Sequence, residues 1–399
     1  MNDNMMLSDV RQSRQVPKTI SILGSTGSVG GNTLDLVGRN PQAYDVVALT
    51  ANRNVTKLAE QAIKFNAQYA VIADEACFQD LKKALSGTNI EAMAGHHALS
   101  EAAQLPAEWV MASIVGAAGL APTLSAIRRG ATVALANKEC LVCAGDLMMQ
   151  EVADSGAILL PVDSEHNAIF QVFDFDRVDS VEGITLTASG GPLIDFSMEQ
   201  MRNATVAQAI AHPNWDMGAK ISIDSATMMN KGLEMIEAYH LFPVAEENID
   251  IVIHPQSVIH SMVTYKDGSI LAQLGAPDMR IPIAYTLGWP QRIDSPAKKL
   301  NLTELQRLDF LEPDFARFPA LGITREALRQ GGTAPTILNA ANEAAVSAFL
   351  EGRIGFLDIV NTVEKTLLKF DIMPLTCLKM VHAIDDEARA IAQKIIRKL

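Results

Sequence analysis

Cysteine is scarce in this sequence, and so is positive charge. The 399 residues contain 4 cysteines, and 33 lysines and arginines against 46 aspartates and glutamates, which gives a formal net charge of −13 at pH 7. So few cysteines exclude a disulfide framework and predict a reducing, cytoplasmic location. The acidic excess argues against nucleic acid or an anionic membrane as a partner, because binding to either requires clustered lysine and arginine.

Long hydrophobic runs are absent as well. No apolar stretch approaches the roughly 18 residues that a membrane-spanning helix requires, so we expect no transmembrane segment. Residues 1–17 mix acidic and basic side chains and contain no apolar core of signal-peptide length. We therefore expect them to form a disordered extension.

The composition that remains is that of a globular protein. Hydrophobic residues make up 48% and charged residues 20% of the chain, which is ordinary for a folded protein and unlike a disordered or fibrous one. The length exceeds what one hydrophobic core usually supports, so two or three domains are expected.

A glycine-rich turn lies near the amino end. A β-rich run over 19–23 leads into Gly24, Gly27 and Gly30 and then into a predicted helix over 32–37. A strand, a glycine turn and a helix in this order let the backbone approach a pyrophosphate at a helix start. The G-x-x-G-x-x-G spacing differs from the common dinucleotide motif, so a tight turn without a ligand is the alternative. The candidate cofactor residues are Gly24, Ser25, Thr26, Gly27, Ser28, Val29 and Gly30.

The next predicted strand, over 45–50, ends close to Arg53 and Asn54. NAD-binding folds usually place an acidic residue there for the ribose 2′-hydroxyl. An arginine instead suits a 2′-phosphate through paired, charge-assisted hydrogen bonds, which predicts NADP over NAD. The alternative is a solvated surface arginine.

Strands and helices continue to alternate beyond this point, which favours a doubly wound parallel sheet. Further strands are predicted over 69–73, 109–114 and 132–136. The last one opens into Asn137, Lys138 and Glu139, at the sheet edge where such folds bind ligands. Cys140 and Cys143 follow, and we expect them to pack in the core because no second cysteine pair is present for a zinc site.

Two acidic clusters lie in the middle of the chain. Asp163 and Glu165 flank Ser164 on a segment read as extended, so that both carboxylates point to one side. Oxygen ligands of this kind suit Mg²⁺ or Mn²⁺, although a plain helix cap is the alternative. Downstream, Asp224 or Ser225 could cap a helix on which Asn230, Lys231 and Glu234 share one face. The alternative for this second cluster is a surface ion pair.

Two further segments lie between the acidic clusters. The turn over 187–192 offers the Ser189 hydroxyl to a phosphate. The segment over 212–218 combines His212 and Trp215 with glycine, as a lid over a small ligand does, although a structural loop is the alternative. His254 and His260 are assigned no more than a supporting role.

The last part of the chain follows a proline-rich connector and shows helical periodicity. Apolar residues recur at helical spacing in two runs: Leu357, Val360, Val363 and Leu367, then Ile384, Ala388, Ile391 and Ile395. An all-α carboxyl-terminal bundle is expected.

Seven of these motifs, in this order, resemble the 1-deoxy-D-xylulose 5-phosphate reductoisomerase family. The matching segments are 24–30, 136–139, 161–167, 188–192, 212–215, 224–234 and 254–260, and the resemblance runs from about Lys18 to the carboxyl end. It implies an enzyme of the non-mevalonate isoprenoid route that converts 1-deoxy-D-xylulose 5-phosphate to 2-C-methyl-D-erythritol 4-phosphate. It also implies NADPH, a divalent cation (Mg²⁺ or Mn²⁺) and a homodimer.

The resemblance assigns roles to individual residues. The implied metal ligands are Asp163, Glu165 and Glu234. The implied phosphate ligands are Ser189, Ser225, Asn230 and Lys231. Ser164 and Lys138 would contact the hydroxyl and carbonyl end of the substrate, and His212 and Trp215 would belong to the closing loop. Lys138, Glu165 and His212 are the catalytic candidates, and Asn137 and Glu139 join the cofactor set. Val29 stands where isoleucine is common in the family, a conservative change.

The expected architecture is α/β, with an N-terminal Rossmann-like sheet, a central α/β catalytic domain and a C-terminal all-α bundle. The expected domains are an extension over 1–17, an NADPH-binding domain over 18–162, a catalytic, metal-binding and dimerisation domain over 163–290, a linker over 291–330 and a helical domain over 331–399.

Two rival functions remain. A simple NADP-dependent dehydrogenase of a small phosphorylated substrate would need no metal, and a non-catalytic NADPH-sensing protein would show no turnover.

Overall fold

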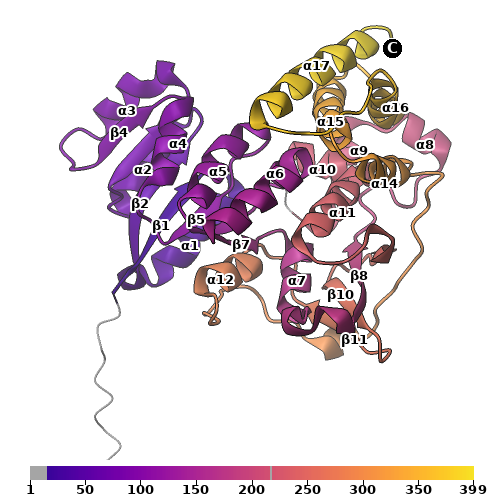
Figure 1. The fold of residues 1–399 in the computed structure, drawn as a ribbon, viewed down its shortest axis with the longest axis horizontal. Helices are drawn as coiled ribbons and strands as arrows, with labels where there is room; N and C mark the ends of the chain where they lie inside the picture. The colour runs from indigo at the N-terminus through magenta and orange to yellow at the C-terminus, as the bar shows by residue number, and fades with distance from the viewer. Residues whose placement is uncertain (1–15, 216–217) are drawn as a thin grey trace, which may run out of the picture.

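The computed structural model describes residues 16–215 and 218–399, so most of the expected amino-terminal extension lies outside the described residues. Its amino-terminal half contains a seven-stranded sheet in the order β4-β3-β2-β1-β5-β6-β7, in which every neighbouring pair is parallel (Figure 1). The strands are β1 (Lys18–Leu23), β2 (Tyr44–Ala51), β3 (Tyr69–Ile72), β4 (Glu91–Ala94), β5 (Trp109–Ala112), β6 (Thr132–Leu135) and β7 (Ile158–Pro161). The predicted Rossmann-like sheet is confirmed.

Helices cover both faces of this sheet, because successive strand residues point to opposite sides. On β5, Trp109 and Met111 join the core on one face, whereas Val110 and Ala112 join the core on the other. The helices are α1 (Ser28–Arg39), α2 (Val55–Lys64), α3 (Phe78–Ala84), α4 (His96–Gln104), α5 (Leu120–Arg128) and α6 (Glu139–Ser155).

A second, four-stranded sheet follows, in the order β11-β10-β8-β9. Its strands are β8 (Val181–Ala188), β9 (Ile249–Ile253), β10 (Ile259–Tyr265) and β11 (Ile270–Leu274). The segment 253–261, whose apolar residues favour a single strand, is instead the end of β9, a turn over 254–258 that contains His254, and the start of β10, which contains His260. The helices that accompany this sheet are α7 (Ser164–Val172), α8 (Met198–Arg202), α9 (Val206–Ile210), α10 (Ala219–Ala226) and α11 (Met229–Leu241).

The carboxyl-terminal part is helical, as predicted, and lies against the central part (Figure 1). Its helices are α13 (Leu302–Leu305), α14 (Ala320–Gln330), α15 (Ala334–Leu350), α16 (Phe356–Leu367) and α17 (Leu378–Ile396). α15 is buried on nearly all sides, which is the pattern of a central helix. On α17, Ala392 and Ile396 are buried, whereas the predicted Ile391 and Ile395 are only partly so. The predicted Ile384 and Ala388 are buried, so the apolar stripe is confirmed over the first part of this helix and is shifted by one residue after Ala388.

α12 (Arg280–Gly288) returns to the amino-terminal sheet. The Trp109 indole Nε1 donates a hydrogen bond of 3.0 Å to the carbonyl of Thr286, and Ile283 joins the core on one face of the seven-stranded sheet. The expected connector over 291–330 contains α13 and α14. The domain boundaries stay a prediction. No helix within 16–215 or 218–399 combines the length and the apolar character needed to cross a membrane.

Candidate active site

The glycine turn after β1 is shaped by close backbone approaches. Gly24 has φ 92°, and a Cβ there would lie 2.8 Å from the Ser113 carbonyl oxygen. A Cβ on Gly30 would lie 2.4 Å from the Gly24 carbonyl oxygen. α1 begins directly after Gly27, without a side-chain cap. The unpaired N–H groups at the start of α1 are therefore exposed to an anion, as the nucleotide prediction requires.

Not every residue of this turn faces outward. The Ser25 hydroxyl is buried and has two acceptors within reach of its one proton, the Thr50 carbonyl at 3.2 Å and Gln61 Oε1 at 2.9 Å. The Thr26 carbonyl accepts a hydrogen bond from Lys57 Nζ at 2.9 Å. The Ser25 side chain therefore holds the shape of the turn.

Arg53 and Asn54 follow β2, the strand next to β1. The Arg53 guanidinium is largely exposed, with Nε 2.7 Å from Asp74 Oδ2. Asn54 caps α2 by accepting a hydrogen bond from the Lys57 backbone at 3.1 Å. An exposed guanidinium at the nucleotide edge remains available to a 2′-phosphate, and this role stays a prediction.

Three consecutive residues after β6 point in different directions. Asn137 is buried, donates to the Gly116 carbonyl at 2.9 Å and accepts from the Cys140 backbone at 3.1 Å. Glu139 points toward Lys220, whose Nζ donates a hydrogen bond of 3.0 Å to Glu139 Oε1. Of the three, only Lys138 lines the large cavity described next.

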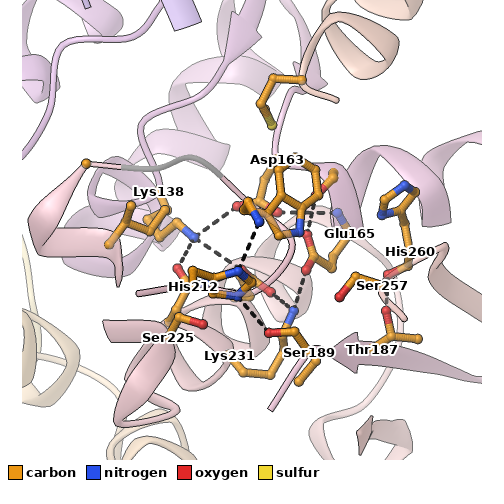
Figure 2. Close-up of a pocket in the computed structure, with 18 of the residues that line it drawn as sticks. Lys138, Asp163, Glu165, Thr187, Ser189, His212, Ser225, Lys231, Ser257 and His260 are labelled. Carbon is orange, nitrogen blue, oxygen red and sulfur yellow. Dashed lines mark hydrogen bonds and ion pairs between the residues drawn. The ribbon is translucent and has the colours of Figure 1, made fainter. Parts of the chain in front are cut away.

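A single cavity brings most of the predicted residues together (Figure 2). It lies between the carboxyl edge of the seven-stranded sheet and helices α7, α10 and α11. The predicted residues that line it are Ser28, Val29, Lys138, Asp163, Ser164, Glu165, Ser189, His212, Trp215, Ser225, Asn230, Lys231 and Glu234. Side chains from both the nucleotide side and the acidic clusters therefore face one space.

Three carboxylates and two ammonium groups meet at the centre of this cavity. One oxygen from each of Asp163, Glu165 and Glu234 lies within 4.8 Å of the others. Lys138 Nζ is 2.9 Å from Asp163 Oδ2, and Lys231 Nζ is 2.7 Å from Glu165 Oε1. Both lysines also pair with Glu234, which is 1% exposed. Such buried charges are stable only because each finds an opposite one.

The charge cluster shifts the pKa values of its members in opposite directions. Burial and the neighbouring Glu234 carboxylate raise the pKa of Glu165 to about 7. Burial opposes ionisation of Asp163 too, but Lys138 and His166 outweigh it and hold the pKa of Asp163 below its usual range. Two like charges at close range therefore force one glutamate toward its neutral form.

These three carboxylates fit a divalent cation. Oxygen donors are the ligands that Mg²⁺ and Mn²⁺ prefer. A bound cation would also offset the repulsion between Glu165 and Glu234 that raises the pKa of Glu165. The donor set and its electrostatics are thus consistent with the predicted ligands.

The helices that carry the carboxylates and the phosphate candidates differ from the prediction in two places. Asp163 is the N-cap of α7 and accepts from the Glu165 backbone at 3.3 Å, so the segment is a helix start and not an extended strand. Asp224 and Ser225 cap nothing, because they lie within α10. The left-handed Met228, with φ 63°, separates α10 from α11. That break brings Ser225 and Asn230 to one wall of the cavity.

The turn after β8 approaches α10 closely. Ser189 Oγ lies 2.9 Å from His212 Nε2. A Cβ on Gly191 would lie 2.6 Å from the Ser225 carbonyl oxygen. Glycine at this position therefore allows the turn with Ser189 to lie next to Ser225.

His212 has a defined tautomer. Its Nδ1 accepts hydrogen bonds from the backbones of Asn214 at 3.1 Å and Trp215 at 3.0 Å. Burial lowers its pKa, so the neutral ring carries its proton on Nε2 and donates it to Ser189 Oγ. Asp216 and Met217, also in the predicted lid, lie outside the described residues.

Several cavity residues were not among the sequence candidates. They include Asn32, Ser257, His260 and Met279. Trp215 lies against His260, with ring centroids 6.1 Å apart, and burial lowers the pKa of His260 to about 4. Ser257 and His260 belong to a motif that the sequence did display, whereas Asn32 and Met279 carried no signal beyond their polarity or size.

The expected packing role of Cys140 and Cys143 is confirmed. Both are buried in the core on one face of the seven-stranded sheet, and burial raises the pKa of both thiols. All four cysteines are free.

A parallel nucleotide-binding sheet whose edge opens onto a carboxylate-rich cavity defines a Rossmann-fold enzyme class with a candidate cation site. One model of the 1-deoxy-D-xylulose 5-phosphate reductoisomerase family matches residues 20–145, and two models of its C-terminal domains match residues 159–242 and 274–391. The chain belongs to the 1-deoxy-D-xylulose 5-phosphate reductoisomerase family.

Its relatives are similar over nearly their whole length. The 1-deoxy-D-xylulose 5-phosphate reductoisomerase of Rhodospirillum centenum is 59% identical over 95% of this chain and 94% of that protein. The enzyme of that name from Zymomonas mobilis, solved in complex with NADPH, superposes with a TM-score of 0.92 at 55% identity, over 96% of this chain and all of that one. A reductoisomerase solved with NADPH, fosmidomycin and magnesium gives a TM-score of 0.91 at 42% identity, over 95% of this chain and 98% of that one.

Proposed function

We propose that this protein converts 1-deoxy-D-xylulose 5-phosphate to 2-C-methyl-D-erythritol 4-phosphate with NADPH, in the non-mevalonate route to isoprenoid precursors. One observation carries the proposal: the nucleotide turn, through Ser28 and Val29, and the carboxylates Asp163, Glu165 and Glu234 line the same cavity. The family membership and the relatives solved with NADPH and magnesium support it.

The reaction rearranges a carbon skeleton and reduces the aldehyde that results. When bound, a divalent cation held by Asp163, Glu165 and Glu234 would polarise the substrate carbonyl, and NADPH would supply the hydride. Lys138 contributes a buried ammonium between the nucleotide edge and the carboxylates, 2.9 Å from Asp163 Oδ2. At that place it stabilises negative charge on the substrate oxygens.

We assign the substrate phosphate to Ser189, Ser225, Asn230 and Lys231, which line the cavity from the turn after β8, from α10 and from α11. Hydroxyl, amide and ammonium donors suit phosphate oxygens. Binding energy from this unreactive end orients the carbons that react.

The loop residues His212 and Trp215 line the same cavity. Neutral His212 donates its Nε2 proton to Ser189 Oγ, and the Trp215 ring would shield a bound substrate from water. We assign both residues to substrate binding, with His212 orienting Ser189.

The proposal is tested by incubating purified protein with NADPH, Mg²⁺ and 1-deoxy-D-xylulose 5-phosphate and following NADPH consumption. We expect turnover that EDTA abolishes and Mg²⁺ or Mn²⁺ restores. Turnover that resists EDTA would favour a simple NADP-dependent dehydrogenase. NADPH binding with no turnover in the complete mixture would favour a non-catalytic sensor.

We also infer a homodimer. β11 is the edge strand of the second sheet and exposes Ile270 and Leu271, with 58% and 48% of their surfaces accessible. Apolar side chains on an open strand edge are typical of an interface. Analytical ultracentrifugation should show a dimer, and Leu271→Lys should shift it toward monomer. A wild-type monomer at micromolar concentration would contradict the inference.

A cytoplasmic location is the remaining proposal. Four free thiols in one chain suit a reducing compartment. Fractionation of the native host cells should place the protein with cytosolic markers, and recovery with secreted proteins would contradict this.

A further inference from the structure

Lys220 joins the two halves of the cavity from outside it. Its Nζ lies 3.0 Å from Glu139 Oε1 and 2.9 Å from Asp224 Oδ2. Lys220 and Asp224 both belong to α10 on the substrate side, four residues apart, whereas Glu139 is the first residue of α6 on the nucleotide side. The ion pair between Lys220 and Glu139 therefore connects two elements that carry different ligand sets.

The partners of Lys220 are adjacent in sequence to residues of the cavity. Glu139 follows Lys138, whose Nζ is 2.7 Å from Asn230 Oδ1. Asp224 precedes Ser225, a phosphate candidate that lines the cavity. A shift of α6 against α10 would therefore move Lys138 relative to Ser225.

The carboxylates that Lys220 holds are deeply buried and otherwise poorly compensated. The side chains of Glu139 and Asp224 are 6% and 1% exposed. Asp224 Oδ1 accepts a hydrogen bond of 2.7 Å from Asn342 on α15, whereas the Lys220 ammonium is the cation close to Oδ2. A buried carboxylate keeps its position when a cation balances it. The geometry of this link is therefore fixed by charge and not by packing alone.

We propose that Lys220 is a positioning residue that couples the substrate side of the cavity to the cofactor side through its ion pair with Glu139, while Asp224 on the same helix holds the Lys220 ammonium in place. Lys220 is not among the residues that line the cavity. Its loss leaves both sides present but free to shift against each other, and small displacements of oriented groups carry large kinetic costs. This inference rests on the proposed function, because it takes the two sides to bind NADPH and the sugar phosphate.

The test measures coupling between the two ligands. NADP⁺ binding is titrated with and without 1-deoxy-D-xylulose 5-phosphate in the presence of Mg²⁺, where the oxidised cofactor cannot complete the reaction. We expect the sugar phosphate to tighten NADP⁺ binding in wild-type protein at least about fivefold. In Lys220→Met this factor should fall close to one, and kcat/KM should drop at least about tenfold.

Three further variants separate positioning from folding. Lys220→Arg keeps charge and reach and should retain most of the coupling. Glu139→Gln keeps the Lys220–Asp224 pair and weakens the link to α6, so it should lose the coupling even if Lys220→Met proves unstable. Glu139 is also a cofactor candidate, but the coupling is a ratio of two NADP⁺ affinities, so a direct loss of NADP⁺ affinity in this variant cancels out of it. Arg128→Met removes an ion pair to Glu151 at the far end of α6 and should behave like wild type.

The outcomes are distinct. Active wild-type protein that shows no coupling, or Lys220→Met and Glu139→Gln variants that keep it, would overturn the inference alone. A merely structural Lys220 would lower the melting temperature and leave the coupling of the folded fraction unchanged, which also overturns it. Wild-type protein with no turnover would overturn the proposed function and this inference with it.

Discussion

The glycine turn after β1 and the charged centre of the cavity are built in opposite ways. The turn is made by seven consecutive residues, and its shape depends on backbone atoms that leave no room for a Cβ at Gly24 or Gly30. The charged centre joins side chains as far apart in sequence as Lys138 and Glu234, and its shape depends on balanced charge. A substitution that adds a side chain should therefore disrupt the turn, and a substitution that removes a charge should disrupt the charged centre.

Changing the charge at Glu234 should have the largest effect. Glu234→Gln removes one of the three proposed carboxylate ligands, so turnover should fall by more than about 100-fold and Mg²⁺ should bind more weakly. The fold should survive, because two ammonium groups then face two carboxylates. Steady-state kinetics, magnesium calorimetry and thermal melting measure the three properties.

Glu151→Gln provides the matched control for that variant. Glu151 is a partly exposed member of an ion pair on α6, outside the cavity, and its loss should cost little. A fully active Glu234→Gln enzyme would remove Glu234 from the ligand set.

Adding bulk at Gly30 should have the next largest effect. A Cβ there would lie 2.4 Å from a backbone oxygen, so Gly30→Ala should weaken NADPH binding at least about tenfold and destabilise the fold by about 1–3 kcal/mol. Gly31→Ala, one residue along α1, meets nothing within 4 Å and should bind NADPH normally. Equal NADPH affinity in the two variants, measured by fluorescence titration, would mean that the turn does not contact the cofactor.

Removing the Lys231 ammonium should act mainly on substrate binding. Lys231→Ala should raise the KM for the sugar phosphate by about tenfold or more, with a smaller change in kcat, because a phosphate ligand acts in the ground state. Initial-rate kinetics at saturating NADPH and Mg²⁺ separate the two constants. A loss of turnover at unchanged KM would instead assign Lys231 to the carboxylates that it contacts in this structure, Glu165 and Glu234.

The smallest expected effect is the alkylation of Cys140 and Cys143, which lie in the core on one face of the seven-stranded sheet. Burial raises the pKa of the Cys140 and Cys143 thiols, so both should resist alkylation in the native protein. Cys377 is exposed and Cys77 partly so, and these two should react. Mass spectrometry after brief treatment with iodoacetamide counts the modified sites, and rapid modification of Cys143 would show that the core beside α15 opens readily.

The turn could be predicted from sequence because its determinants are contiguous. Strand, glycines and helix appear in order, and the alternation of strands and helices led to the parallel sheet. β4 was missed, because Glu91–Ala94 is a short edge strand with no buried residue and no alternating pattern. The hydrogen-bonded pairing with β3, and not a preference of its own sequence, keeps this segment in a strand conformation.

For the cavity, the sequence predicted individual residues but not their arrangement in space. Local patterns indicated Asp163, Glu165 and Glu234 as separate candidates, and the resemblance to a family implied that they bind one metal ion. The break between α10 and α11 was missed because the left-handed conformation of Met228, a non-glycine residue, has no sequence signature. The contact of Lys231 with Glu165, 66 residues away, depends on tertiary packing that periodicity does not encode.

The identity of the product tests the central claim most directly. The wild-type protein is incubated with 1-deoxy-D-xylulose 5-phosphate, NADPH and Mg²⁺, and the product is examined by proton NMR. If the skeleton rearranges before reduction, the methyl group sits on a carbon without hydrogen and gives a singlet, as in 2-C-methyl-D-erythritol 4-phosphate. A methyl doublet would show that the ketone was reduced in place, and would make the protein a simple dehydrogenase.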